Sequence, residues 1–444
     1  MTKLARRLGP FDAALIVMGG IIGSGIFRNP SVVAKIVWVP AAIAGVWIAG
    51  GIISVLGAFV IAELAARRPQ DGGFYAYLRD AFHPMVAFMY GWTLLLVSQS
   101  GGMAAAALTF AGYYPALTGQ NVSQPLLAFF VLAVFTIVNC LGVRQGGNVQ
   151  NGFMVLKIGA IVVLIVAGFL THPSAAAAAA TPSTGTTLGL LGAMVASMVA
   201  VMFAYSGWQT ASFMSGELKD PKRSLPIGLL WGVAGVIVLY LLVNVVCLRV
   251  LGVSGLMHTD APASEVARAF MGARGAQFMA AIISLSTLGF LSNQILTSPR
   301  VYHAMAEDGL FFKSIAWVHP KTRVPVVAIA LQGVVAIVIT FWKGYASILN
   351  YVIGVDFLFF TLAAIAVFVF RARDRDKPAD NGFSVPFHPY TTALFMLIAF
   401  GITLTSYITS WQGAAATFAL FALAVPFYYL FLFLRARVPT GRTL

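Results

Sequence analysis

The chain has 444 residues, of which 59% are hydrophobic and 9% are charged, and its mean hydropathy is +0.88. This composition excludes an ordinary soluble domain, because the apolar residues recur in stretches long enough to cross a bilayer. The formal net charge of +14 would suit a nucleic-acid partner, but the basic residues cluster beside the apolar stretches, where they act as orientation signals.

Twelve apolar segments predict an all-α integral membrane protein with a single transmembrane domain over residues 1–444. Residues 11–171 and 188–371 are candidate repeats of five spans each, and residues 391–434 hold two additional helices. The predicted spans are 11–37, 41–66, 84–114, 124–142, 149–171, 188–215, 225–252, 275–305, 324–342, 346–371, 391–410 and 414–434.

The basic residues predict the orientation of these spans. With the N-terminus in the cytosol, most Lys and Arg residues fall on the cytosolic side, which is the positive-inside bias, and the C-terminus is then cytosolic as well. The few that fall outside are Lys35, Arg249, Arg268, Arg274 and Lys343. We therefore expect a multi-pass plasma membrane protein whose basic excess reflects its topology.

The first predicted span is interrupted near its middle by Gly23, Ser24 and Gly25. Unpaired backbone groups are costly in hydrocarbon, so a break at this depth indicates contact with protein, water or a ligand. The helical stretch after the break presents free amides at its positive end, which suits a carboxylate. The alternative is a face of small residues that packs against another helix.

A second interruption, at residues 205–208, lies at the same depth of the sixth span. If the two sets of five helices are inverted repeats, the breaks meet near the middle of the membrane. The half-helix before this break ends in carbonyl groups that can accept hydrogen bonds from an ammonium group. Donors on one half-helix and acceptors on the other predict a receptor for a zwitterion such as an α-amino acid. Phe203, Tyr205 and Trp208 then wall or gate the pocket, or are ordinary packing aromatics.

Lys157 lies about two turns into the fifth predicted span and Asp356 midway along the tenth. An intramembrane lysine is a functional candidate by default, and the alternative is a side chain that reaches the cytosolic surface. Asp356 can receive a substrate amine, carry a proton, cap a broken helix, or serve as a hydrogen-bonded packing acid. Glu63 and Asp12 lie near span ends, where we expect ordinary surface roles.

Several short motifs follow one another along the chain: IIGSGIF at 21–27, AEL at 62–64, GGFYAYL at 72–78, FAYSGW at 203–208, ELKDP at 217–221 and TSPR at 297–300. In this order they resemble the amino acid–polyamine–organocation superfamily, and within it the L-type amino acid transporter-like branch. The resemblance covers nearly the whole chain. It implies a leucine-transporter-type fold with two inverted repeats of five helices, in which the first and sixth helices are broken, and two extra helices.

The resemblance also implies roles for individual residues. The substrate carboxylate is expected at the amides around Ser24, Gly25 and Ile26, directly after Gly23. The amino group is expected at backbone carbonyls, and Phe203 is expected to act as an aromatic gate. The residues that carry these carbonyls are Ile21, Phe203, Ala204 and Tyr205.

Lys157 matches a lysine whose ammonium group takes the place of a sodium ion in the family, and Ser286 matches its hydroxyl partner on the eighth helix. Sodium dependence is therefore not expected. Asp356 departs from the family, because animal members carry Asn there. The external segment 115–124 contains no Cys, so we expect no disulfide-linked accessory subunit.

These observations predict a secondary transporter of L-amino acids in a bacterial inner membrane that works by alternating access. Sodium-independent exchange and proton symport both stay open. The same fold would allow a transporter of polyamines or other cationic amines, with Asp356 as counter-charge. A membrane sensor or embedded enzyme is the remaining alternative, and the missing catalytic clusters disfavour it. No metal-ligand or nucleophile pattern is present in the sequence, so no cofactor is expected.

Overall fold

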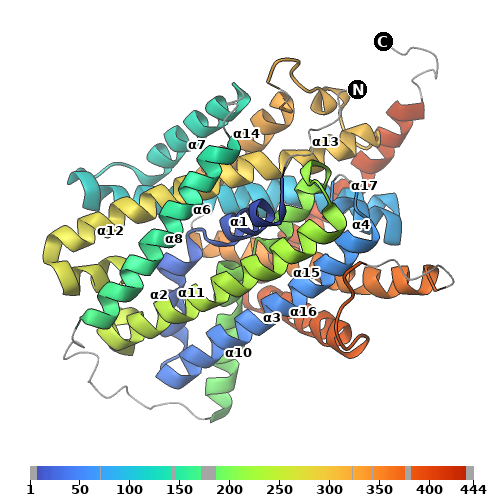
Figure 1. Ribbon diagram of the computed structural model, residues 1–444. Coiled ribbons are helices and arrows are strands. Elements are labelled where there is room, and N and C mark those ends of the chain that lie inside the picture. The colour runs from blue at the N-terminus through green and yellow to red at the C-terminus, as the bar shows by residue number, and fades with distance from the viewer. Residues whose placement is uncertain are drawn as a thin grey trace.

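The computed structural model describes residues 8–70, 72–141, 146–171, 187–322, 324–342, 345–375 and 382–436. Within these ranges the chain forms helices joined by loops, and the one β contact is an isolated bridge between Leu8 and Leu218. Figure 1 shows many of the long helices running side by side in roughly a common direction. Helices satisfy their own backbone hydrogen bonds and can therefore cross a bilayer, and helices that cross the same bilayer share a rough direction.

Each of the twelve predicted segments coincides with a helix or a broken helix, which confirms the all-α membrane class. Among the described residues, eight helical stretches are long and apolar enough to cross a membrane, a bent pair qualifies together, and three apolar helices are shorter. In chain order the helices that coincide with the predicted segments are α1 (Pro10–Ile21) with α2 (Gly25–Ile36), α3 (Pro40–Arg67), α5 (Pro84–Thr93) with η1 (Leu94–Ser98) and α6 (Gln99–Thr118), α7 (Gln124–Cys140), α8 (Gly146–Leu170), α10 (Thr187–Tyr205) with η2 (Trp208–Glu217), α11 (Pro221–Met257), α12 (Pro262–Thr297), α14 (Val326–Trp342), α15 (Tyr345–Arg373), α16 (Tyr390–Thr409) and α17 (Trp411–Ala436).

The broken helices are the first and sixth spans, as the predicted inverted repeats require. The two-fold relation between residues 11–171 and 188–371 itself stays a prediction. Small residues let α1 approach α11 closely, since a Cβ atom on Gly232 would lie 2.8 Å from the Val17 side chain. Such contacts between small residues are a common way for membrane helices to associate.

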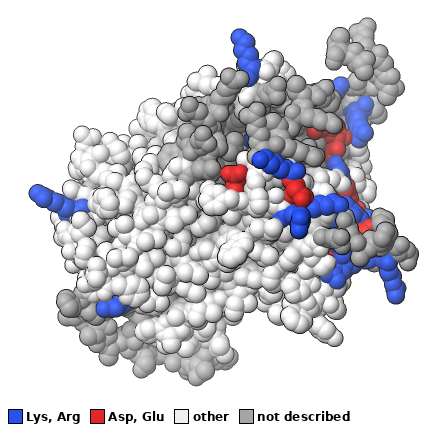
Figure 2. Space-filling model, viewed as in Figure 1, with Lys and Arg blue, Asp and Glu red and all other residues white. Residues whose placement is uncertain are grey.

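The charged side chains are distributed unevenly over the molecule. Figure 2 shows the visible sides of the bundle almost free of charge, with Lys, Arg, Asp and Glu gathered mainly at one end. At that end lie α17 and the short helices α4 (Phe74–Ala81) and α13 (Pro299–Glu307), followed in the chain by η3 (Lys313–Ala316) (Figure 1). Residues 1–7 and Lys343, which enter the predicted orientation, lie outside the described residues.

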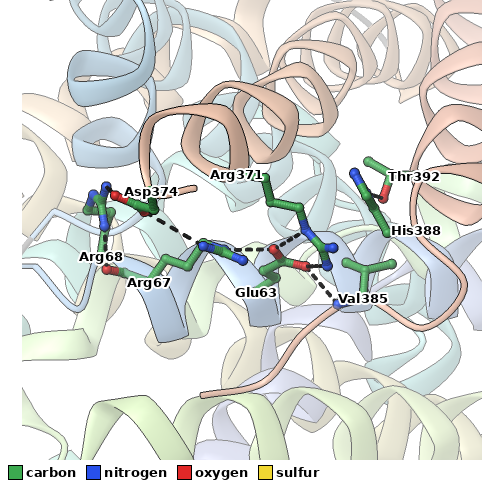
Figure 3. A network of polar contacts seen from close by, with 8 residues as sticks. All are labelled: Glu63, Arg67, Arg68, Arg371, Asp374, Val385, His388 and Thr392. Carbon is green, nitrogen blue, oxygen red and sulfur yellow. Dashed lines mark hydrogen bonds and ion pairs between the residues drawn. The ribbon is translucent and has the colours of Figure 1, made fainter. Parts of the chain in front are cut away.

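The expectation of an ordinary surface role for Glu63 is wrong. Its side chain is 0% exposed, and its Oε1 accepts hydrogen bonds of 2.7 Å from the Nε atoms of Arg67 and Arg371. Its Oε2 accepts two more, also of 2.7 Å, from Arg371 Nη2 and the Val385 amide (Figure 3). This carboxylate therefore joins the end of α3 to the end of α15 and to the segment before α16. The sequence alone indicates the pair of Glu63 with Arg67, one helical turn later, but not the pair with Arg371, which is far away in the chain.

Candidate functional site

The first span breaks between α1 and α2, whose axes differ by 43°. α1 ends at Ile21 and α2 begins at Gly25, so residues 22–24 belong to neither helix. The first amides of a helix have no acceptor within that helix. The amides of Gly25 and Ile26 therefore stand at the break as donors, at the positive end of α2.

The sixth span breaks between α10 and η2, through Ser206 and Gly207. Gly207 has a φ of 115°, a left-handed conformation that residues with a Cβ atom rarely adopt. A Cβ atom there would also collide with the carbonyl of Gly20. The last turn of α10 ends in carbonyl groups that no further amide of the same helix reaches, so acceptors gather at this break.

The two breaks meet, as the sequence predicts. A Cβ atom on Gly25 would lie 2.6 Å from Ala204 Cα, and Gly207 presses against Gly20 on the other side. The backbones of two helices far apart in the sequence thus touch at the point where each loses its regular hydrogen bonds.

A cavity of about 40 Å³ lies at this contact, with room for a few water molecules. Two walls enclose it. The main-chain wall comes from the two broken helices and consists of Gly20, Ile21, Gly23, Ser24, Gly25, Phe203, Ser206, Gly207 and Gln209. The side-chain wall comes from η1, α6, α12 and α15 and consists of Ser98, Gln99, Gly102, Phe290, Gln294, Val352 and Asp356.

The side-chain wall depends on a π-helical turn, η1, between α5 and α6. Such turns are rare and occur often at functional sites. Here Ser98 ends the turn and donates a hydrogen bond to Oδ1 of Asp356, and the next residue, Gln99, accepts one of 3.0 Å from the Ser298 hydroxyl. Sequence reasoning missed Ser98, Gln99 and Gln294, because nothing in an apolar span marks the turn or the side of the helix that faces a cavity.

The structure brings some of the predicted site residues together and leaves others outside. The predicted residues that line the cavity are Ile21, Gly23, Ser24, Gly25, Phe203 and Asp356. Those that lie outside it are Ile26, Ala204, Tyr205, Lys157 and Ser286.

Two of the three aromatic residues around the second break are packing residues. The Tyr205 hydroxyl donates a hydrogen bond of 3.3 Å to the carbonyl of Trp47, and its ring lies away from the cavity. Trp208 stacks on Phe360 with ring centroids 4.5 Å apart. Phe203 is the aromatic residue of this group that lines the cavity.

Lys157 is completely buried, so the alternative in which it reaches the cytosolic surface is wrong. Its Nζ donates a hydrogen bond of 2.9 Å to the carbonyl of Ile22, inside the first break. Ser286 is buried too, but its hydroxyl has no hydrogen-bond partner among the described residues. Lys157 therefore ties α8 to the break, and the predicted link onward to Ser286 is not formed in this structure.

The carbonyl of Ile21, a predicted acceptor for the substrate, already has donors. The Tyr240 hydroxyl lies 3.1 Å from it and the Gly23 amide 2.8 Å. A carbonyl oxygen has two lone pairs, so these two bonds occupy its usual capacity. Among the described residues, no three His, Cys, Asp or Glu side chains are placed to hold a metal ion.

A bilayer-spanning bundle with two broken helices around a central cavity defines a multi-pass α-helical transporter. A family model for amino acid permeases matches residues 8–434, and the chain therefore belongs to the amino acid permease family. Membership of this family makes the protein a transporter and not an enzyme, as the sequence predicts.

Three relatives illustrate the similarity. The serine/threonine exchanger SteT of Bacillus subtilis (strain 168) is 26% identical over 431 residues, which cover 96% of this chain and 97% of that protein. The mouse (Mus musculus) b(0,+)-type amino acid transporter 1 is 28% identical over 417 residues, or 90% of this chain and 83% of that protein. The human (Homo sapiens) large neutral amino acids transporter small subunit 2 is 28% identical over 390 residues, or 84% and 71%.

Proposed function

We propose that the protein is a secondary active transporter that carries L-amino acids by alternating access. The observation that carries the proposal is the contact of two broken helices beside one cavity, with Gly25 against Ala204 and Gly207 against Gly20. Main-chain donors and acceptors at this contact suit the carboxylate and ammonium groups that all α-amino acids share.

The carboxylate binds the amides of Ser24, Gly25 and Ile26, where the dipole of α2 favours negative charge. The ammonium group binds the carbonyl end of α10, at residues 203–205. Because the Ile21 carbonyl already accepts two hydrogen bonds, α10 supplies the main acceptors in this proposal. Phe203, which lines the cavity, is the proposed gate.

Lys157 takes the role of a bound cation in this proposal. Its ammonium group lies 2.9 Å from the Ile22 carbonyl, so it stabilises the break without a sodium ion. Ser286, whose buried hydroxyl has no partner among the described residues, becomes its second contact in another state of the cycle. Transport is then independent of sodium and proceeds by exchange or with a proton.

The charge distribution supports the proposed setting of the transporter. Charged side chains gather mainly at one end of the molecule, which we assign to the cytosol together with both termini (Figure 2). We place the protein in a bacterial inner membrane. Because residues 115–124 contain no Cys, we propose that it works there without a disulfide-linked subunit.

Transport of polyamines or other cationic amines is the second candidate function, and Asp356 favours it. Among the lining residues that the structure describes, Asp356 is the only charged one. A cationic amine would neutralise this carboxylate. It would leave the amides of the first break without an anion.

Uptake into proteoliposomes tests both candidates. Vesicles containing the purified protein receive a labelled amino acid mixture, with or without unlabelled amino acids inside and with or without a pH gradient. Uptake that needs internal amino acids establishes exchange, and uptake into empty vesicles driven by the pH gradient establishes proton symport. If decarboxylated amines compete as well as the parent amino acids, the carboxylate assignment is wrong and the amine transporter takes its place.

A further inference from the structure

The two walls of the cavity offer different chemistry to a bound molecule. The main-chain wall holds the backbone groups of the two breaks, together with the side chains of Ser24, Ser206 and Gln209, whereas the side-chain wall offers a carboxylate, two carboxamides and a hydroxyl. An α-amino acid held by its carboxylate and ammonium groups at the first wall directs its side chain toward the second. This step rests on the function proposed above.

The polar groups of the side-chain wall are incompletely paired. Gln294 is 4% exposed, and its Oε1, a hydrogen-bond acceptor, is buried without a partner among the described residues. Buried polar groups without a partner are rare in folded proteins. Other buried polar atoms among the described residues also lack a partner, Gln332 Oε1 among them, but Gln294 Oε1 is the unpaired carboxamide oxygen of a residue that lines the cavity. A donor on a ligand in the cavity can therefore pair with it.

Asp356 is 5% exposed and acts as an acceptor, since the Ser98 hydroxyl donates to its Oδ1. A carboxylate offers about four acceptor positions, so one bond from Ser98 leaves most of this capacity unused. A ligand that carries a hydrogen-bond donor would therefore complement the Asp356 carboxylate.

Bulky side chains limit the size of that ligand. A Cβ atom on Gly23 would lie 2.9 Å from the ring of Phe290, so this ring closes the space beside the first break. Val352 lines the same wall, and the cavity has a volume of about 40 Å³. Beside these two side chains a short ligand side chain is a better match than a long one.

We infer that the side-chain wall selects amino acids with a short side chain that ends in a hydrogen-bond donor, and that Gln294, Asp356 and Ser98 determine this specificity. A hydroxyl group meets both requirements, because it is short and its hydrogen can be donated to the Asp356 carboxylate or to Gln294 Oε1. A methyl group in its place offers a donor to neither of them.

L-Serine and L-2-aminobutyrate provide the test, because their side chains have the same number of heavy atoms and differ by a hydroxyl for a methyl. Binding of each to the purified full-length protein is measured as stabilisation against heat, from which an apparent Kd follows. We expect serine to bind at least about tenfold more tightly, since sites that hydrogen-bond a substrate hydroxyl reject the analogue without it. Equal affinities would overturn the inference.

Variants assign the preference to residues. In Gln294→Met the advantage of serine should fall to within about threefold, because the paired carboxamide is gone. Gln332→Met is the matched control: Gln332 is equally buried, but its Nε2 contacts Met103 Sδ at 3.1 Å outside the cavity. An unchanged ratio in a folded Gln294→Met protein removes Gln294 from the assignment, and Ser98→Ala provides a second test of the wall.

The outcome separates this inference from the proposed function. If none of serine, 2-aminobutyrate and alanine stabilises the wild-type protein while the labelled amino acid mixture enters proteoliposomes, the specificity inference fails and the amino acid site stands. If that uptake fails as well, both fail. If all three stabilise it equally, the amino acid site stands and the specificity inference fails. The comparison of serine with 2-aminobutyrate on the wild-type protein tests the inference even where a variant does not fold.

Discussion

Ser24 is the residue at which a single donor can be removed with little disturbance. Its φ of −70° is the value that a proline ring imposes, so Ser24→Pro deletes the amide hydrogen while the backbone keeps its course. We expect amino acid binding to weaken about 10- to 100-fold, the effect of losing one hydrogen bond to a charged group. Competition binding on the purified variant measures this.

Ser24→Ala is the control for this experiment, because it removes the hydroxyl and keeps the amide. It should bind amino acids more tightly than the proline variant. Unchanged binding in a folded Ser24→Pro protein would falsify the assignment of the carboxylate to this break.

Lys157 is the second residue whose role can be isolated. Lys157→Met keeps most of the side-chain volume but removes the ammonium group that holds the Ile22 carbonyl. We expect transport to slow by at least about tenfold, a typical size for coupling between sites, while the unfolding temperature changes little. Exchange kinetics in proteoliposomes and thermal unfolding are measured on the same sample, and wild-type kinetics would reduce Lys157 to a structural residue.

The network around Glu63 acts between elements, because it fastens α3 to α15 and to the segment before α16 (Figure 3). Arg371→Ala leaves a buried carboxylate with fewer partners, and we expect a loss of about 3–5 kcal/mol in the free energy of unfolding. Arg268→Ala is the control, since its pair with Glu265 is exposed and should contribute at most about 1 kcal/mol. Denaturation of both variants in the same detergent gives the comparison. Equal losses would contradict a special role for the buried network.

His388 lies beside the Glu63 network and makes this connection between α3, α15 and the segment before α16 sensitive to pH. Burial lowers the pKa of His388 from its ordinary value, Arg371 and Arg67 lower it further, and Glu63 opposes them. The folded state therefore binds a proton less readily than the unfolded state, so the stability contributed by neutral His388 is complete above a pH of about 6.5 and is lost below it.

We expect the unfolding temperature of the wild type to fall between pH 7.5 and pH 5 by more than that of His388→Gln. His258→Gln, at an exposed histidine, serves as control and should follow the wild type. Parallel declines in all three proteins would show that His388 does not contribute.

At the scale of the whole molecule, sequence pattern was sufficient for the spans and for the two breaks. Both follow from local composition, since apolar stretches and glycine-rich interruptions are visible residue by residue. The partners of Glu63 and the side-chain wall could not be predicted, because they depend on which helices touch. Arg371 and Gln294 look unremarkable in the sequence, and only the packing of α15 and α12 gives them their roles.

The division of the cavity into a main-chain wall and a side-chain wall has a consequence for evolution. Backbone amides and carbonyls are common to all residues, so most substitutions leave the recognition of a zwitterion intact as long as the breaks keep their shape. The side-chain wall carries no such protection, since each of its contacts belongs to one replaceable residue. A lineage with this architecture can thus exchange one cargo for another by a few substitutions on α6, α12 or α15, while the means of holding an amino acid is inherited unchanged.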